Sequence, residues 1–263
     1  MTTLSYAVRD NATMLRRTLK RILRYPSMTL LLVGMPVVFL LLFVYVFGGT
    51  LGNGLGGAGG RAEYVRYVIP GILLMTVAAA ANGTAVSVSM DMTEGIVARF
   101  RTMAIARASV LTGHVLGSVI QSMAGLAIVL AVGFLIGFRA TTDPVRWLAA
   151  AGLLALVSVA FVWLCVALGL VAKTVESASN LPMPLTLLPF LGSGFVPTDS
   201  MPVGLRQFAE YQPFTPIIET LRGLLTGGPI GGNGVAALAW CVGIALVSYL
   251  WARRLYNRDP APH

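Results

Sequence analysis

Six long windows without a charged residue divide this sequence of 263 residues, and they constrain its fold more than any other feature. A helix needs about 20 apolar residues to cross roughly 30 Å of hydrocarbon. A charged residue at the centre of such a helix costs about 2.5–3.5 kcal/mol on insertion scales. Each window is long enough to cross a membrane: residues 25–60, 67–90, 108–138, 147–172, 177–198 and 223–252.

The windows predict six membrane-spanning helices, and the composition agrees with this class. Only 11% of the residues are charged, against about 25% in soluble domains. The apolar runs are continuous rather than alternating, which favours helices over the strands of a membrane barrel. We therefore predict an all-α integral membrane protein whose six spans form a single domain over residues 27–263. The spans are expected at about 28–47, 67–90, 109–138, 147–171, 178–196 and 234–252.

The distribution of basic residues predicts the orientation. Thirteen of the 19 Lys and Arg residues fall in the segments 1–25, 91–107, 173–176 and 253–263. With six spans, these four segments lie on the same side of the membrane. The positive-inside rule then places this side, with both termini, in the cytosol. Topology and anionic lipid headgroups explain the net charge of +9, so it does not call for nucleic acid as a partner.

Residues 1–26 are predicted to form a cytosolic amphipathic helix in the membrane interface. Between Leu4 and Arg24 apolar residues alternate with an Arg- and Lys-rich face, and Pro26 ends the pattern. A basic amphipathic helix of this kind lies beside anionic lipid. The alternative, a basic tail that only sets the topology, stays open.

Residues 197–230, between the fifth and sixth spans, are predicted to form a helical hairpin on the outer face. Apolar residues recur there at helical spacing, Pro213 and Pro216 interrupt the pattern, and Gly227 ends it. We expect both amphipathic helices to dip into the lipid headgroups. The glycine-rich residues 48–60 are expected to form a flexible external loop.

The chain carries no recognisable source of energy for transport. Residues 167–174, ALGLVAKT, have alanine at both positions where a phosphate-binding loop needs glycine. All six spans lack Asp, Glu, Lys and Arg, which ion-coupled carriers place inside the membrane. Two histidines and no cluster of acidic residues leave a metal site unsupported. We predict no catalytic residue, no bound cofactor and no metal on this chain.

Small and mildly polar residues mark one face of the second span and one face of the fifth. Pro182, Pro184 and Pro189 weaken the fifth helix and can free backbone carbonyls toward a cavity. The two faces fit either a substrate path or seams of helix packing, which small residues favour. At an interface between two copies they can be both. The candidate path residues are Thr76, Asn82, Thr84 and Ser87 in the second span, and Met183, Thr186, Phe190 and Ser193 in the fifth.

A short charged helix is predicted on the cytosolic side between the second and third spans, in the stretch DMTEGIVARFRTMAIARASVLTG at 91–113. Asp91 is expected to cap it, with Glu94 reaching back as in a capping box. Phe100 and Met103 belong to an apolar stripe of this helix, and Arg99 points elsewhere. The helix is either an interfacial turn or a handle that a separate cytosolic protein grips.

Two stretches carry a family resemblance. MTEGIVARFRTMAIARASVLTGHVLG resembles the coupling-helix segment of ABC-2-type transporter permeases. GSGFVPTDSMPVGLRQFAEYQPFTPIIETLRGLLTGG resembles the C-terminal signature of the same family. Its most specific residues are Phe195-Val196-Pro197, Met201-Pro202, Gln212-Pro213, Pro216 and Arg222. The likeness covers essentially the whole chain and is strongest for the permeases of daunorubicin-resistance-type drug exporters.

The resemblance implies an exporter in the bacterial plasma membrane, built from two permease copies or close homologues and two separate cytosolic ATP-binding subunits. ATP and magnesium then bind to those subunits, and the permease itself is not an enzyme. Residues 92–106 form the coupling helix that docks into the ATPase, and the second and fifth spans of the two permeases line the path. The residues expected to couple to the ATPase are Glu94, Gly95, Arg99, Phe100, Met103 and Arg107.

Members of this family export hydrophobic drugs, lipids or polysaccharide precursors. The apolar character of the candidate path favours a hydrophobic small molecule, such as a drug, a natural product or a lipid, over a polysaccharide precursor. A hypothesis from another class is a passive membrane scaffold or anchor subunit, which needs neither a path nor an ATPase. A channel is disfavoured because the sequence has no ring of charges and no carbonyl filter.

Overall fold

A computed structural model describes residues 26–55, 60–93 and 107–257 of the chain. Every regular element in these ranges is a helix, which confirms the all-helical class. Within the same ranges, five helices are long and apolar enough to cross a membrane: Leu32–Asn53, Arg61–Thr93, Val115–Leu135, Pro144–Val171 and Asn233–Tyr256. These helices match the predicted spans other than the fifth.

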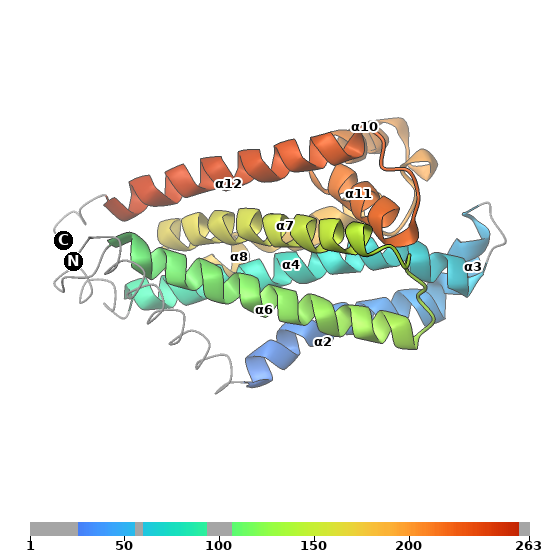
Figure 1. Cartoon of the computed structure of the whole chain (residues 1–263). Helices are drawn as coiled ribbons and strands as arrows, with labels where there is room; N and C mark the ends of the chain where they lie inside the picture. The colour runs from blue at the N-terminus through green and yellow to red at the C-terminus, as the bar shows by residue number, and fades with distance from the viewer. Residues whose placement is uncertain (1–25, 56–59, 94–106, 258–263) are drawn as a thin grey trace.

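The long helices lie side by side in one bundle (Figure 1). They are α2 (Pro26–Leu42), α4 (Arg61–Thr93), α6 (Arg107–Leu135), α7 (Pro144–Val171) and α12 (Asn233–Asn257). We call the end of the bundle where α4, α7 and α12 begin the loop end. The opposite end, where α4 stops, is the Thr93 end.

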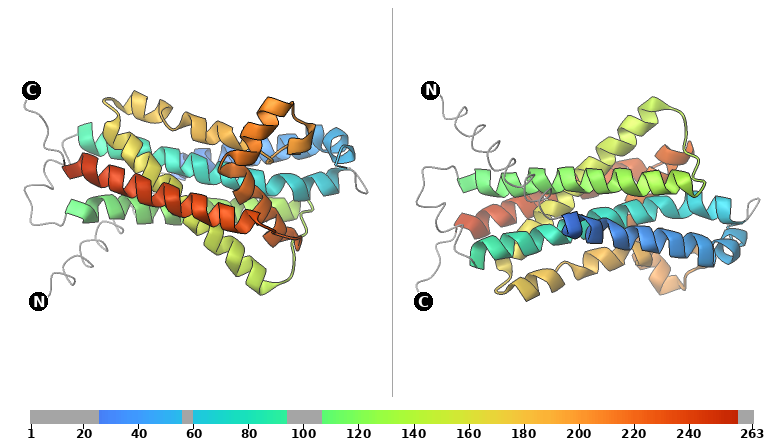
Figure 2. Two further views of the ribbon diagram at one scale, coloured as in Figure 1. Left: turned by 90° about the horizontal axis from the view of Figure 1, so that it is seen from above. Right: turned by 90° about the horizontal axis from the view of Figure 1, so that it is seen from below.

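Helix α4 occupies the centre of the bundle and contacts α2, α6 and α7 (Figure 2). In its most apolar window 72% of the residues are buried, against 22% in α12. Small residues allow helices to approach closely. A side chain added at Gly169 of α7 would place its Cβ 2.6 Å from the backbone oxygen of Ala85 in α4. Helix α4 is therefore surrounded by its own chain over most of its length.

The first span is longer than predicted and changes its helical form. After α2 it continues as a π-helical turn, η1 (Phe43–Phe47), and then as α3 (Gly48–Asn53). The prediction of a flexible loop over residues 48–60 is therefore wrong for residues 48–53, and residues 56–59 lie outside the described part of the chain. The glycine at position 52 serves close backbone packing here, because a Cβ added there would lie 2.1 Å from the Gly60 oxygen.

The fifth predicted span is not one continuous helix. It is divided into α8 (Val175–Asn180), α9 (Met183–Leu187) and the 3-10 turn η2 (Leu188–Leu191), so the prediction of one proline-weakened helix over about 178–196 is wrong in its continuity. Pro182 precedes α9 and Pro189 lies in η2, and proline lacks the N–H that an α-helix uses. We call residues 175–196 the broken segment. It runs along α4 from the Thr93 end toward the loop end (Figure 2).

Two further helices lie at the loop end, α10 (Val203–Tyr211) and α11 (Phe214–Thr226), after the 3-10 turn η3 (Thr198–Ser200). The predicted pair of helices is confirmed, and Gly227 ends α11 with a φ of 83°. Pro216 lies inside α11 and does not break it. The apolar side of α11 is buried against α4, α7 and α12. The expectation that both helices reach lipid headgroups is therefore wrong for α11.

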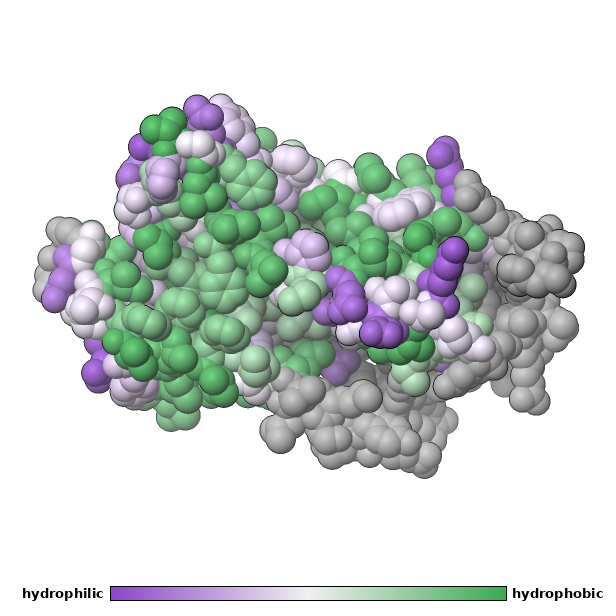
Figure 3. Space-filling view, turned by 180° about the vertical axis from the view of Figure 1, so that it is seen from behind, coloured by the Kyte–Doolittle hydropathy of each residue, from purple (hydrophilic) through white to green (hydrophobic). Residues whose placement is uncertain are grey.

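The surface of the bundle suits a membrane. Seen from the side opposite to Figure 1, hydrophobic residues cover much of the middle of the molecule, and hydrophilic residues gather at the loop end and again toward the other end (Figure 3). Helix α12 exposes large apolar side chains, including Val235, Leu246 and Leu250. Exposed apolar surface of this extent marks contact with lipid or with another protein.

Candidate functional site

The structure describes only the two ends of the predicted coupling segment. Glu94, Gly95, Arg99, Phe100 and Met103 lie outside the described residues, and Arg107 is the first residue of α6. The coupling role of these residues therefore stays a prediction.

The structure does place the residue expected to cap the coupling helix. Asp91 is buried inside α4, which continues to Thr93. A cap residue has non-helical backbone angles. The prediction that Asp91 caps the following helix is therefore wrong.

One side of α4 is partly exposed near the Thr93 end. Its residues recur every three or four positions, as one face of a helix requires, and we call them the α4 stripe: Ala79, Asn82, Gly83, Val86, Ser87 and Met90. The stripe lies beside α2, because a Cβ added at Gly83 would be 3.6 Å from the Leu32 side chain. Two predicted path residues, Asn82 and Ser87, belong to it. Closer to the loop end, every residue of α4 from 68 to 78 is buried.

The other two candidate residues of α4 face the interior of the bundle. Thr76 is buried, and its hydroxyl donates to the Ile72 oxygen at 2.8 Å. Thr84 is also buried, and its hydroxyl lies 2.7 Å from the Ser118 hydroxyl of α6. The structure does not bring these two side chains to the α4 stripe, and their contacts are those of a packing seam.

Four phenylalanines connect the first span to the broken segment. The rings of Phe190 and Phe195 are stacked, with centroids 4.3 Å apart and an angle of 4° between their planes. Phe43 of η1 lies 4.6 Å from Phe195, and Phe39 of α2 lies 5.7 Å from Phe190. Offset and edge-to-face contacts between such rings are stabilising. We call these four residues the aromatic cluster.

Sequence reasoning named Phe190 as a path residue and Phe195 as part of the family signature, but neither Phe39 nor Phe43. The i, i+4 spacing of Phe39 and Phe43 was an available signal, because it puts both rings on one helical face. Of the other candidates, Met183 is 53% exposed, and the hydroxyl of Thr186 donates to the Met183 oxygen at 2.7 Å. Ser193, in contrast, is buried.

Arg222 of α11 joins three elements at the loop end. Its Nη2 atom donates to the Ser193 oxygen at 2.7 Å and to the Tyr67 oxygen at 3.2 Å. Its Nη1 atom forms an ion pair with Glu219, and the guanidinium lies 3.9 Å from the centre of the Tyr67 ring. Charge-assisted hydrogen bonds and contact with an aromatic face both stabilise a partly buried arginine.

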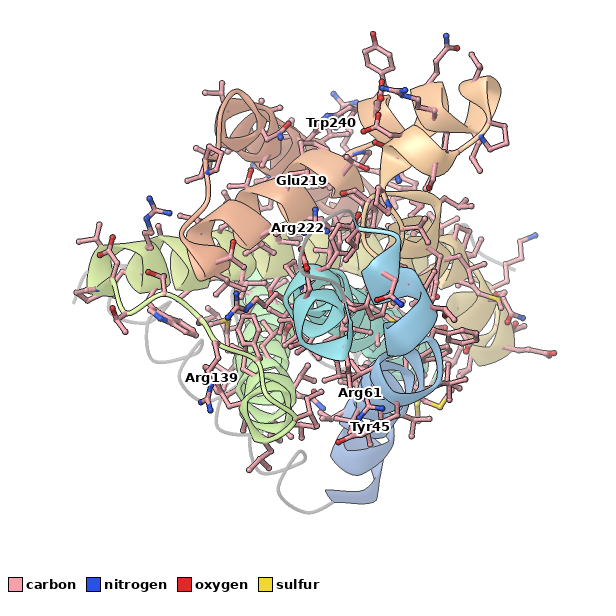
Figure 4. All side chains as sticks on the ribbon, turned by 90° about the vertical axis from the view of Figure 1, so that its right-hand side faces the viewer. Tyr45, Arg61, Arg139, Glu219, Arg222 and Trp240 are labelled. Carbon is pink, nitrogen blue, oxygen red and sulfur yellow. The ribbon has the colours of Figure 1, made fainter. Side chains whose placement is uncertain are left out.

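We call Arg222, Glu219, Tyr67 and Ser193 the loop-end clamp, because they hold α11 and the broken segment against α4. Viewed onto the loop end, Arg222 and Glu219 lie toward the middle of the bundle, whereas Arg139 lies at its edge (Figure 4). The family signature contained Arg222, but the sequence alone assigned it no contact.

Close packing reinforces the clamp. The hydroxyl of Tyr64 in α4 donates to the Phe195 oxygen at 3.2 Å. Gly71 of α4 meets Gly194 so closely that an added Cβ would lie 2.7 Å from the Gly194 oxygen. The broken segment is thus fixed to the half of α4 nearer the loop end by backbone contact as well as by polar contact.

Helix α11 is also fixed at its C-terminal end. Arg146 of α7 donates to the oxygens of Gly223 and Gly228 at 3.2 and 3.1 Å. A cation near the last carbonyls of a helix is favoured by the helix dipole. The backbone N–H of Thr141 donates to the Leu225 oxygen at 2.8 Å, which joins the loop after α6 to the same end.

Among the described residues, no three His, Cys, Asp or Glu side chains lie close enough together to hold a metal ion. The two cysteines, Cys165 and Cys241, are free and buried.

Comparison with known proteins gives one family and several relatives. The sequence model of the family described as ABC-2 type transporter matches residues 10–226. The daunorubicin resistance ABC transporter permease protein DrrB1 of Streptomyces coeruleorubidus is 30% identical over 259 residues, which covers 97% of this chain and 88% of the relative. The probable doxorubicin resistance ABC transporter permease protein DrrC of Mycobacterium tuberculosis is 26% identical over 214 residues, covering 80% and 76% of the two chains.

Proposed function

The chain belongs to the ABC-2 type transporter family, and on that premise we propose that it is the membrane permease of an ATP-driven exporter of hydrophobic small molecules. The names of its relatives, which refer to resistance to daunorubicin and doxorubicin, support a drug or drug-like natural product as the substrate. Two separate cytosolic ATP-binding subunits hold ATP and magnesium and dock on residues 92–106. The permease itself is not an enzyme.

The broken segment is the sixth membrane crossing in this proposal. As an α-helix, residues 175–196 would extend about 33 Å at 1.5 Å per residue, close to the roughly 30 Å of hydrocarbon. Non-helical backbone is tolerated at membrane depth where protein or a water-filled cavity surrounds it, and this segment is packed on α4. With six crossings, the Thr93 end faces the cytosol of a bacterial cell together with both termini, and the loop end faces outside.

The proposed substrate path runs along the α4 stripe. Asn82 has a buried side-chain oxygen without a hydrogen-bond partner among the described residues. Polar side chains within a membrane are costly in lipid and face the protein interior or a water-filled cavity. We place a second permease copy, or a close homologue, opposite the stripe, with the path between the two stripes and beside Met183 of the broken segment.

The aromatic cluster closes this path toward the outside. It joins the first span to the broken segment on the loop-end side of the stripe, where α4 is fully buried. ATP drives export by favouring a state in which these rings separate, since a ligand shifts an equilibrium only through its different affinity for the two states.

Co-purification tests this function directly. The tagged chain, extracted from its own cells in gentle detergent, is expected to carry a stoichiometric ATP-binding subunit. Phe100→Ala and Arg99→Ala should lose this subunit, whereas Arg139→Ala, which changes an exposed arginine at the loop end, should retain it. If the wild-type complex contains no ATPase, the exporter proposal is contradicted and a passive scaffold becomes the better account.

A further inference from the structure

We propose that Ser193, Gln212 and the first turn of α11 form a binding site for a neutral hydroxyl or carbonyl group of the transported molecule. This inference rests on the export function proposed above and names the chemistry that the substrate brings to the path. The site lies next to the aromatic cluster in the chain, because Ser193 falls between Phe190 and Phe195.

The start of α11 lies well inside the bundle. The ring of Phe214, the first residue of α11, is 5.1 Å from the ring of Phe161 in α7. Phe161 is about 25 Å along α7 from its first residue, Pro144, at 1.5 Å per residue. Helix α11 therefore runs from the interior toward the loop end. In secondary transporters, the N-termini of interrupted transmembrane helices point at anionic groups of the substrate, so a helix start at membrane depth can meet a substrate.

Two buried polar atoms near this helix start are unpaired within the part of the chain that the structure describes. They are the Ser193 hydroxyl and the Gln212 side-chain oxygen. The Ser193 residue is 2% exposed and Gln212 is 6% exposed. Buried polar atoms are nearly always paired in folded proteins, so two unpaired ones here indicate a ligand group that the chain alone does not supply.

Contacts of neighbouring groups hold Ser193, Gln212 and the first turn of α11 beside one another. The Gln212 amide nitrogen donates to the Leu188 oxygen at 3.3 Å, which fixes the amide and leaves its oxygen available. The Ser193 N–H donates to the hydroxyl of Thr215, in the first turn of α11, at 3.3 Å. A Cβ added at Gly192 would lie 2.6 Å from the Gln212 amide nitrogen and 2.9 Å from the Thr215 hydroxyl.

The available groups select the ligand. The site offers an amide oxygen as acceptor, hydroxyls that can donate or accept, and a helix start that no side chain caps among the described residues. Arg222, which binds the Ser193 backbone oxygen, has its charge paired with Glu219, although its buried Nε has no hydrogen-bond partner among the described residues. A neutral group that can exchange hydrogen bonds therefore fits, whereas a phosphate or a carboxylate would lack a counter-charge.

The test uses Ser193→Ala in the complete permease–ATPase complex in lipid nanodiscs, with daunorubicin as the probe. This change removes a hydroxyl that has no partner among the described residues, so it breaks no side-chain hydrogen bond within them. We expect daunorubicin affinity, measured by fluorescence titration, to fall about fivefold to tenfold, as for the loss of one buried hydrogen bond. The melting temperature should stay the same or rise.

Ser89→Ala is the matched control. Ser89 is also buried with an unpaired hydroxyl among the described residues, but it lies on α4 about 27 Å from Gly71, which packs on the broken segment, at 1.5 Å per residue. This variant should bind daunorubicin as the wild type does. If Ser193→Ala binds daunorubicin as tightly as the wild type does, the proposed binding site is contradicted. If its melting temperature is also lower, the Ser193 hydroxyl binds a structural water rather than the substrate. A wild-type complex that daunorubicin neither binds nor stimulates contradicts the proposed function itself.

Discussion

The two halves of α4 differ in what surrounds them. From residue 68 to residue 78 every residue is buried, and the loop-end clamp and the aromatic cluster close this half. From Ala79 to Met90 the same helix leaves the α4 stripe partly exposed. Backbone packing differs accordingly, because Gly71 in the closed half meets the backbone of Gly194, whereas Gly83 in the open half meets only the end of the Leu32 side chain.

This contrast is one of packing, because buried atoms unpaired among the described residues occur in both halves, the Ser193 hydroxyl beside the closed half and the Asn82 side-chain oxygen in the open half. In the closed half, the largely buried guanidinium of Arg222 binds two backbone oxygens, a carboxylate and an aromatic ring. In the open half, the side-chain oxygen of Asn82 lacks a partner among the described residues. Stability is therefore expected to depend mainly on the loop-end clamp and on close backbone packing, and transport on the groups proposed to contact the substrate, which are the α4 stripe, the aromatic cluster and the Ser193 hydroxyl.

The largest loss of stability is expected from a substitution that breaks the loop-end clamp. Arg222→Met removes every polar contact of the guanidinium and leaves Glu219 without its cation. Breaking a buried ion pair by removing one partner costs about 3–5 kcal/mol; because Arg222 is partly exposed, we expect the lower end. Thermal unfolding of the purified protein measures the loss. Arg206→Met, which changes an exposed ion pair in α10, should unfold like the wild type.

A smaller loss is expected from disturbing the backbone contact between α4 and the broken segment. Gly71→Ala puts a Cβ 2.7 Å from the Gly194 oxygen, and overpacking of this kind costs about 1–3 kcal/mol. Gly152→Ala in α7 is the control, since no described atom that could obstruct its added Cβ lies within 4 Å. If both variants melt at the same temperature, the close packing of the closed half is contradicted.

Removing one ring of the aromatic cluster should affect transport more than stability. Phe190→Ala loses the stacked contact with Phe195, worth about 0.5–1.5 kcal/mol beyond its buried area. We expect drug efflux from cells to fall while the protein stays folded. Phe208→Ala, in an exposed position of α10, should leave efflux unchanged; equal efflux in the two variants would remove the cluster from the path.

The smallest effect on stability is expected in the open half. Asn82→Leu removes a side-chain oxygen that has no partner among the described residues, so unfolding should change by less than about 1 kcal/mol. Drug-stimulated ATPase activity of the complex should nevertheless fall. Thr76→Val, on the buried side of α4, should show the opposite pattern, with lower stability and normal stimulation. Loss of stability in Asn82→Leu would identify the stripe as structural.

The sequence predicted the features that depend on composition along the chain. Charge-free windows located the five long helices, and Gly227 marked the end of α11. Pro182 and Pro189 indicated that the fifth span was weak, but not that it divides into three elements. The amphipathic pattern of α11 showed an apolar side without showing whether lipid or protein covers it.

Sequence patterns could not predict contacts between residues that are far apart in the chain. Phe39 and Phe190 are far apart in the chain, so only the folded structure unites the aromatic cluster. Arg222 was recognised as part of a family signature, yet its bonds to Tyr67 and Ser193 depend on how α11 enters the bundle. The sequence analysis chose Asn82 and Ser87 together with Thr76 and Thr84. Only the packing of the neighbouring helices shows that Asn82 and Ser87 are partly exposed, whereas Thr76 and Thr84 are buried.

Cysteine labelling along α4 in native membranes tests the central contrast most directly. In a chain with Cys165 and Cys241 replaced by alanine, single substitutions such as Asn82→Cys and Ser87→Cys would be treated with a water-soluble maleimide. A water-lined path predicts rapid labelling at both positions, slowed by transported drug, and no labelling for Ile72→Cys or Thr76→Cys in the closed half. No labelling of the stripe, or equal labelling of both halves, would contradict a path along the open half of α4.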